Sequence, residues 1–387
     1  MVNDPLPKTA DAVVIGGGVM GASTAYHLAQ RGVKNIVLLE KEEFFGQGAT
    51  GRCAGGVRYQ FATEINIRLS LASLPMLERI PEELSQEVDY RKCGYLFLLN
   101  NEKDIQTFKY NVSLQNRLGV QTEWLTGEEI RKRLPLMRLD DIQAGTWNAE
   151  DGLCDPNGVV MAYINAAMKL GAQCINNIEV TDLGVNGNKI AEVKTNKGNI
   201  ASPIIVNAAG PWAGVIGDMA GVKIPITPVR RQMLTTTPLP EIPADFPFVI
   251  DFDQSLYFHR EGDGLLTGMS NQNEQPGFDQ NVDLDFEIIN MEAASKRLPL
   301  LEKAGVVSHW AGLYEVTPDA HPIFGKTPIE GFFLVAGFSG HGFMHGPIAG
   351  KLMTEIILEG APKTVDVSRL DLARFDEGRE IVEYNVV

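Results

Sequence analysis

The stretch DAVVIGGGVMGASTAYHLAQRGVKNIVLLEKEEFFGQGATGRCAGGVRYQF, residues 11–61, decides the fold of this protein. The apolar run "DAVVIGGG" predicts a strand that ends in glycines, and "GASTAYHLAQRG" predicts a helix that ends at Gly32. The run "NIVLLEK" predicts a second strand. Strand, helix and strand in this order make a βαβ unit, which implies a parallel sheet that is buried by helices. The stretch therefore predicts an α/β domain.

Three glycines in this stretch, Gly16, Gly18 and Gly21, match the dinucleotide-binding pattern G-x-G-x-x-G between the strand and the helix. Gly16 permits the tight turn, Gly18 lets the backbone approach a pyrophosphate, and Gly21 lets the helix pack closely on the strand. Glu40 ends the second strand, where its carboxylate can accept hydrogen bonds from ribose hydroxyls and would repel a 2′-phosphate. The fingerprint disfavours NADP and leaves FAD and NAD open.

The rest of the chain alternates between two kinds of segment. Residues 202–213 and 331–360 again combine an apolar strand, a glycine turn and a helix or helix start. The runs "CGYLFLLNN", "RRQMLTTTP", "QSLYFHRE" and "DGLLTGMSN" are short β-type segments typical of an antiparallel sheet. We therefore expect a Rossmann-like parallel-sheet domain interwoven with an antiparallel-sheet substrate domain of α+β type. The expected nucleotide-binding domain comprises residues 8–80, 145–220 and 318–375, and the expected substrate domain comprises 81–144 and 221–317.

Composition excludes several classes of function. The 387 residues include 34 Lys and Arg against 49 Asp and Glu, a formal net charge of −15, which argues against nucleic acid or an anionic membrane as the main partner. No signal peptide is visible, and no apolar run approaches the length of a transmembrane helix. The four cysteines are scattered and form no C-x-x-C pair. We expect a reduced, cytoplasmic protein with no disulfide framework and no metal site.

Together with "IIVNAAGPWAG" and "VAGFSGHGFMHGP", residues 11–61 resemble the D-amino-acid oxidase superfamily of flavoenzymes, in particular its sarcosine oxidase and glycine oxidase branch. The β subunits of heterotetrameric sarcosine oxidase and of archaeal L-proline dehydrogenase look most similar, because "GYLFLL", "TWN…DG", "WAG.Y..TPD" and "AGFSGHGFM" occur in similar order. The resemblance covers nearly the whole chain. It implies that the fingerprint binds the ADP half of FAD and that the flavin lies between the two domains.

The resemblance also implies which residues meet the cofactor. The loop 46–56 would pass over the isoalloxazine ring, and the turn 337–343 would lead into a helix whose N-terminus stabilises negative charge on the reduced flavin. The alternative for His341 is a purely structural turn residue. The residues expected at the cofactor are Gly16, Gly18, Gly21, Glu40, Lys41, Gly48, Ala49, Thr50, Arg52, Cys53, Ala54, Gly55, Ala209, Gly210, Trp212, Gly337, Gly340, His341, Gly342, Phe343 and Met344.

Non-covalent FAD is expected, because the sequence differs at two positions from relatives that attach the flavin covalently. The cysteine that attaches the flavin of monomeric sarcosine oxidase falls at Gly312, and the histidine of dimethylglycine-dehydrogenase-like proteins falls near Arg52. Neither nucleophile is present at these positions.

Four residues are the expected catalytic set: Arg58, Tyr257, His341 and Arg52. Arg58 matches the arginine that binds the substrate carboxylate in monomeric sarcosine oxidase, and a guanidinium grips a carboxylate with two parallel hydrogen bonds. The alternative for Arg58 is a surface or interdomain ion pair, and Arg52 and Arg231 are reserve candidates for the carboxylate contact. Tyr257 matches an active-site tyrosine of the family, whose phenol could hold a carboxylate, or it is simply an aromatic core residue.

Three other departures bear on substrate and electron acceptor. Tyr314 replaces the carboxylate arginine of glycine oxidase, and Met344 replaces a lysine of monomeric sarcosine oxidase. Leu266 stands where the oxygen-activating lysine of that enzyme would fall. We therefore expect weak oxygen reactivity, with electrons passing to another acceptor or to an α subunit.

The expected reaction is oxidation of a secondary amine or amino acid, by transfer of the Cα hydride to flavin N5, to an imine that water hydrolyses. Sarcosine, L-proline, hydroxyproline, a D-amino acid and an opine all remain possible substrates. One alternative is a glycine or D-amino-acid oxidase that uses oxygen, and another is a non-catalytic subunit that holds FAD within a larger complex. A disulfide reductase is excluded, because the chain lacks a redox C-x-x-x-x-C and a second nucleotide fingerprint.

Overall fold

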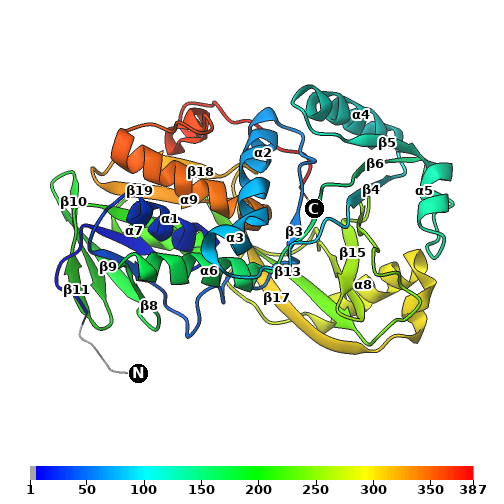
Figure 1. The fold of residues 1–387 in the computed structure, drawn as a ribbon, viewed down its shortest axis with the longest axis horizontal. Helices are drawn as coiled ribbons and strands as arrows, with labels where there is room; N and C mark the ends of the chain where they lie inside the picture. The colour runs from blue at the N-terminus through cyan, green and yellow to red at the C-terminus, as the bar shows by residue number, and fades with distance from the viewer. Residues whose placement is uncertain (1–5, 387) are drawn as a thin grey trace.

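Residues 6–386, which the computed structural model describes, form two halves that each contain one large sheet (Figure 1). The sheet of the first half has six strands. In spatial order they are β18 (Ile323–Lys326), β19 (Phe332–Ala336), β12 (Ile205–Asn207), β1 (Ala12–Ile15), β2 (Ile36–Leu39) and β8 (Gln173–Ile175). β1 pairs in parallel with both β2 and β12. The predicted βαβ unit is confirmed, with α1 (Val19–Gln30) as its helix.

Both faces of this sheet are covered, because its strand residues alternate between two hydrophobic cores. Ala12 and Val14 of β1 face one core, which also receives helices α1, α2 (Glu64–Glu78), α6 (Pro156–Lys169) and α9 (Gly342–Glu359). Val13 and Ile15 face the other core. That side is closed by α7 (Ala213–Met219) and a three-stranded sheet of β9 (Val180–Asn186), β10 (Lys189–Thr195) and β11 (Gly198–Ala201).

The second half contains an eight-stranded sheet. In spatial order its strands are β17 (Val306–Val316), β13 (Thr227–Thr236), β16 (Gly264–Met269), β15 (Leu256–Glu261), β14 (Phe248–Asp251), β4 (Tyr95–Leu99), β6 (Ala144–Asn148) and β5 (Glu123–Thr126). Neighbouring strands are antiparallel, as predicted, except that β14 and β4 pair in parallel. Its helices are α4 (Glu102–Arg117), α5 (Gly127–Arg133) and α8 (Leu284–Arg297).

Short elements join the two halves. β3 (Gly56–Val57) pairs with β7 (Gly152–Leu153), and α3 (Ile80–Leu84) follows α2. Four short 3-10 helices span Gly210–Trp212, Pro299–Lys303, Ser368–Leu370 and Leu372–Phe375. The expected domain boundary at residue 145 falls inside β6, which belongs to the eight-stranded sheet.

One ion pair is buried within the first half. Arg374 binds both carboxylate oxygens of Asp319, at 2.8 and 2.9 Å, and also donates to the carbonyls of Leu370, Asp371 and His321. Arg374 is fully buried, so every donor bond replaces one that water would otherwise supply. This pair ties the residues after α9 to the loop that follows β17.

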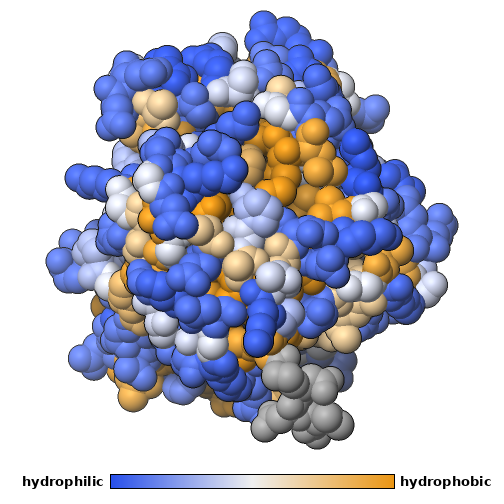
Figure 2. Space-filling view, turned by 90° about the vertical axis from the view of Figure 1, so that its left-hand side faces the viewer, coloured by the Kyte–Doolittle hydropathy of each residue, from blue (hydrophilic) through white to orange (hydrophobic). Residues whose placement is uncertain are grey.

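The surface of the first half is mainly hydrophilic. Figure 2 shows polar and charged residues over most of this face, with apolar residues grouped in a recess. Among residues 6–386, no helix is both long enough and apolar enough to span a bilayer.

Candidate active site

A cavity of about 270 Å³ opens at the carboxyl ends of β1, β2 and β12. Parallel strands end at one edge of a sheet, and ligands of open α/β sheets bind at that edge. Residues from three separate segments line it: Gly16, Gly18, Glu40, Lys41, Gly48, Ala49, Thr50, Ala209, Gly210 and Trp212. The structure therefore brings the predicted nucleotide-binding segments together.

The fingerprint glycines differ in what surrounds them. Gly16 has φ +110°, and a Cβ there would overlap the carbonyl oxygen of Ala208. A Cβ at Gly21 would overlap the carbonyl oxygen of Gly16, so this glycine sets the close approach of α1 to the turn after β1. A Cβ at Gly18 would have only the Thr50 hydroxyl near it, at 3.2 Å. Gly18 is therefore open toward the cavity.

The groups around Gly18 suit a diphosphate and a ribose. Helix α1 has glycine at its N-cap and no acidic residue in its first turn, and only the Thr50 hydroxyl, at 3.2 Å from the Val19 nitrogen, accepts from its first N–H group, so its N-terminal dipole can favour an anion. The Glu40 carboxylate accepts hydrogen bonds from the backbone N–H groups of Gly17, at 2.7 Å, and Glu42, at 2.9 Å. These bonds hold the carboxylate at the cavity, where its remaining lone pairs can accept from ribose hydroxyls.

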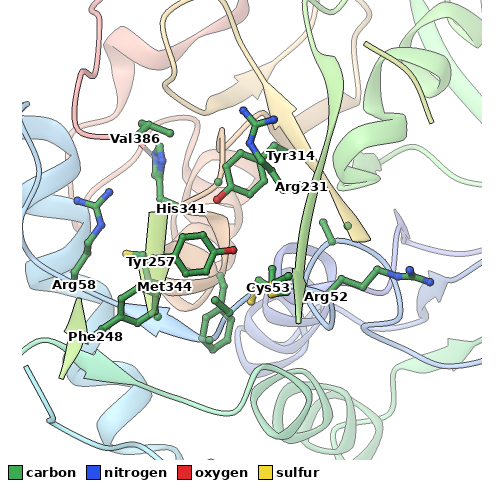
Figure 3. Close-up of a pocket in the computed structure, with 18 of the residues that line it drawn as sticks. Arg52, Cys53, Arg58, Arg231, Phe248, Tyr257, Tyr314, His341, Met344 and Val386 are labelled. Carbon is green, nitrogen blue, oxygen red and sulfur yellow. The ribbon is translucent and has the colours of Figure 1, made fainter. Parts of the chain in front are cut away.

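A second cavity, of about 100 Å³, adjoins the first (Figure 3). Ala49, Cys53, Leu313, Tyr314, Gly340 and Phe343 line both. The second cavity is also lined by Arg52, Ala54, Gly55, Arg58, Arg231, Phe248, Tyr257, His341, Met344 and Val386. The loop 46–56 and the turn 337–343 thus meet between the two cavities. Burial raises the pKa of the Cys53 thiol there to about 12, so it stays protonated.

Arg58 lies in the wall of the second cavity and is only 6% exposed. Its guanidinium donates to the carbonyl of Gln60 and, at 2.6 Å, to that of Asn385, and it lies 4.0 Å over the ring of Phe61. Within residues 6–386 it forms no ion pair. Burial lowers the pKa of Arg58, because loss of water disfavours the charged form, and the nearby carboxylates of Glu383 and Asp151 offset only part of that effect. The predicted alternative, a structural ion pair, has no partner in the described chain.

Arg52 and Arg231 occupy other parts of the same wall. Arg52 donates to the carbonyls of Ala311, at 2.8 Å, and Gln47, at 3.2 Å, and Figure 3 shows its guanidinium directed away from Tyr257. Arg231 is half-buried, with its guanidinium 5.2 Å over the ring of Tyr314. Among residues 6–386, no acidic side chain lines this cavity.

His341 and Tyr257 face the second cavity from different elements. His341 is buried just before α9, and neither ring nitrogen has a hydrogen-bond partner within the described residues. Burial holds the pKa of His341 well below its usual range, so the ring is neutral. Tyr257 lies on β15, where burial raises its pKa, and the absence of a side chain at Gly268 makes room for its hydroxyl.

Two residues of the expected cofactor set line neither cavity. Gly21 packs against the backbone of Gly16, as above. Gly337 has φ +83°, and a Cβ there would meet the Thr317 side chain at 2.5 Å. Both shape the backbone around the cavities, and all the other expected site residues lie in the lining.

Two buried acids were not anticipated. Asp151 accepts hydrogen bonds from the Tyr59 backbone, at 2.7 Å, and the Gln60 amide, at 2.9 Å, and burial raises its pKa to about 7. Glu315 lines the first cavity, with one carboxylate oxygen unpartnered in the described chain, and burial raises its pKa to about 7. No pattern marks a single acid as buried, because burial depends on which distant segments cover it. Within residues 6–386, no group of three or more His, Cys, Asp or Glu side chains could hold a metal ion.

Known proteins match this chain over nearly its whole length. The family model described as FAD dependent oxidoreductase matches residues 11–356. Mitochondrial sarcosine dehydrogenase of Mus musculus is 34% identical, covering 96% of this chain and 42% of its own. Mitochondrial dimethylglycine dehydrogenase of Rattus norvegicus is 33% identical, covering 95% of this chain and 45% of its own. The chain thus spans less than half the length of these curated relatives.

Solved structures agree with this match. L-proline dehydrogenase from P. horikoshii has a TM-score of 0.90 and 36% identity, over 97% of this chain and 100% of that one. Glycine oxidase from Bacillus cereus ATCC 14579, at 24% identity and a TM-score of 0.79 over 91% and 95% of the two chains, shares the fold. The α/β fold and the choice of FAD over NAD are confirmed: the chain belongs to the DAO family of FAD dependent oxidoreductases, and its cofactor is FAD.

Proposed function

We propose that this protein oxidises a small amine that carries a carboxylate, a secondary amine or amino acid of the kind named in its relatives. Sarcosine, dimethylglycine and L-proline appear in those names. One observation carries the proposal: Arg58 is a buried guanidinium without an ion-pair partner in the described chain, in a cavity that adjoins the FAD cavity.

A buried charge with no counter-charge is costly, and it attracts an anion that can replace the lost water. Arg58 uses two of its five N–H donors on the carbonyls of Gln60 and Asn385, which leaves donors for a substrate carboxylate. Arg231 is more exposed than Arg58, so water covers part of its charge. We therefore assign the carboxylate contact to Arg58 and treat Arg231 as a weaker, outer contact.

The cavity also suits the neutral form of the amine. The part of the lining that the structure describes has three arginines and no acidic side chain, so it repels an ammonium group and offers it no counter-charge. His341 is neutral, and its ring nitrogens can meet the substrate nitrogen without adding charge. Bound at the adjoining cavity, FAD would supply the acceptor for the hydride on the carbon beside that nitrogen. The imine formed is hydrolysed by water after release.

We further propose non-covalent FAD and an electron acceptor other than oxygen, either a small molecule or a partner subunit. Within the described part of the chain no lysine lines the second cavity, and Leu266 is buried in a cluster with Met233, Phe248 and Tyr257. A competing candidate is an oxidase that uses oxygen, which is the activity named for glycine oxidase. Stopped-flow mixing of the reduced protein with air-saturated buffer separates the two: fast reoxidation would favour the oxidase.

Anaerobic reduction of the bound flavin tests the main proposal. Each carboxylated amine is compared with its decarboxylated partner: L-proline with pyrrolidine, and sarcosine with dimethylamine. We expect flavin reduction by at least one carboxylated amine and a marked preference over its partner. Arg58→Met should lower kcat/KM for that amine by about 100-fold, because a charged hydrogen-bond pair contributes about 3 kcal/mol. Arg231→Met is the matched control with a smaller loss. If no carboxylated amine reduces the flavin, the chain is a subunit that only holds FAD.

A further inference from the structure

Residues 380–386 run in an extended path between α2 and β4, where the two halves meet (Figure 1). Exposed apolar side chains alternate with buried polar ones along this segment. Val382 and Tyr384 are 44% and 68% exposed, whereas Glu383 and Asn385 are 3% and 1% exposed. Folding stability alone favours the opposite, because burying polar groups costs free energy and burying apolar ones releases it. The polar face of this segment is therefore turned inward, against the start of α2 and the backbone of Gln60.

Glu383 fastens the segment to the start of α2. One carboxylate oxygen accepts from the backbone N–H groups of Ala62, at 2.9 Å, and Asn385, at 3.0 Å. The other accepts from the backbone and hydroxyl of Thr63, at 3.1 and 2.7 Å, and from the Asn66 amide, at 3.0 Å. Five donors converge on one buried carboxylate at a helix N-terminus, where negative charge is also favoured by the helix dipole.

Asn385 connects the segment to Arg58. Its carbonyl accepts from the Arg58 guanidinium at 2.6 Å, and its amide donates to the carbonyl of Gln60 at 2.7 Å. Gln60 supplies the other carbonyl that holds Arg58. The next residue, Val386, lines the second cavity, and Figure 3 shows it on the same side as Arg58 and opposite Tyr314.

We propose that residues 380–386 position Arg58 for the substrate carboxylate, with Glu383 and Asn385 as positioning residues and Val386 as part of the substrate-cavity wall. The inference rests on the proposed function, in that Arg58 is taken as the carboxylate contact. A guanidinium held by two carbonyls has a defined plane, and the two-bond grip on a carboxylate depends on that plane. The contact with Arg58 is the backbone carbonyl of Asn385, so it depends on where Glu383 and the Asn385 amide hold the segment; if the segment shifts, Arg58 keeps its charge and loses its orientation.

The test compares Glu383→Ala with Tyr384→Ala in the FAD-loaded protein. Tyr384 lies in the same segment with its side chain in solvent, so its variant controls for general effects of mutating the segment. Two quantities are measured: kcat and KM for a carboxylated amine and for its decarboxylated partner, and the Kd of benzoate, a non-oxidisable carboxylate, from the change in flavin absorbance. FAD content and circular dichroism report folding.

We expect Glu383→Ala to raise the KM for the carboxylated amine and the Kd of benzoate at least tenfold, because a misplaced contact of about 1 Å has effects of that order or larger. The KM for the decarboxylated partner and the FAD content should not change. Glu383→Gln, which keeps one acceptor oxygen, should recover part of the loss, and Tyr384→Ala should stay within about twofold of the wild type. Asn385→Ala replaces Glu383→Ala if that variant does not fold.

Equal rises in KM for the carboxylated amine and for its decarboxylated partner would mean that the segment has only a structural role, and would overturn the inference. An unchanged Kd of benzoate in folded Glu383→Ala and Asn385→Ala would also overturn it. Failure of the proposed function has a different signature. In that case no amine reduces the flavin of the wild type. Benzoate binding needs no turnover, so it still reports whether the segment positions Arg58. If benzoate does not bind to a wild type that oxidises carboxylated amines, the positioning role of the segment is refuted and the proposed function stands.

Discussion

Replacing Gly18 with alanine should separate cofactor binding from folding. Gly18 has φ −77° and ψ −175°, an extended conformation that alanine adopts without strain. Its Cβ would meet only the Thr50 hydroxyl, at 3.2 Å, and would otherwise point into the cavity that receives the FAD diphosphate. The added methyl group therefore takes space from the cofactor and disturbs the apoprotein little.

Gly21, the third glycine of the fingerprint, is expected to respond differently to the same substitution. At Gly21 the same methyl group would lie 3.1 Å from the carbonyl carbon of Gly16 and overlap its oxygen, so the backbone of α1 or of the turn has to move. Overpacking of this kind costs about 1–3 kcal/mol of unfolding free energy. Gly18→Ala should cost less than about 1 kcal/mol in the apoprotein. It should weaken FAD binding by about 100-fold or more, which corresponds to about 2.7 kcal/mol.

Two measurements on flavin-free protein check this: urea unfolding followed by tryptophan fluorescence, and titration with FAD. Gly277→Ala is the neutral control, because a Cβ there has nothing within 4 Å. The reasoning is refuted if Gly18→Ala binds FAD with the wild-type Kd, or if it destabilises the apoprotein as much as Gly21→Ala does.

Three further substitutions probe buried charges. The pKa of Glu315 is about 7 in the folded apoprotein and about 4.3 in the unfolded chain. Between these pH values only the folded state holds the proton, so the unfolding free energy falls as pH rises. In urea unfolding, Glu315→Gln should reduce that fall between pH 5 and pH 7 and leave the part that is due to Asp151. Arg374→Met leaves Asp319 buried without its partner and should cost about 3–5 kcal/mol of unfolding free energy, seen as a lower urea midpoint. Glu40→Gln should raise the Kd of FAD about tenfold, because a ribose acceptor is weakened, and an unchanged Kd would contradict that role.

The βαβ unit and the FAD fingerprint could be predicted because their information is local. Apolar periodicity and the spacing of Gly16, Gly18 and Gly21 lie within one stretch, and each glycine is required by atoms close along the chain or by the cavity next to it. The antiparallel strands of the second half were also marked by their own composition. The parallel pairing of β4 with β14 could not be predicted from composition, because it joins segments about 150 residues apart and no local pattern encodes such a pairing.

The sequence by itself therefore determined the fold class and a dinucleotide-binding fingerprint, and its resemblance to a flavoenzyme family indicated FAD. Only the tertiary structure decided that Arg58 is buried without an ion-pair partner in the described chain and is held by the carbonyl of Asn385, 327 residues away. The same holds for the buried carboxylates of Glu315 and Asp151. The physical reason is that residue type sets what a side chain can do, whereas its solvation, charge state and partners depend on the distant segments that cover it.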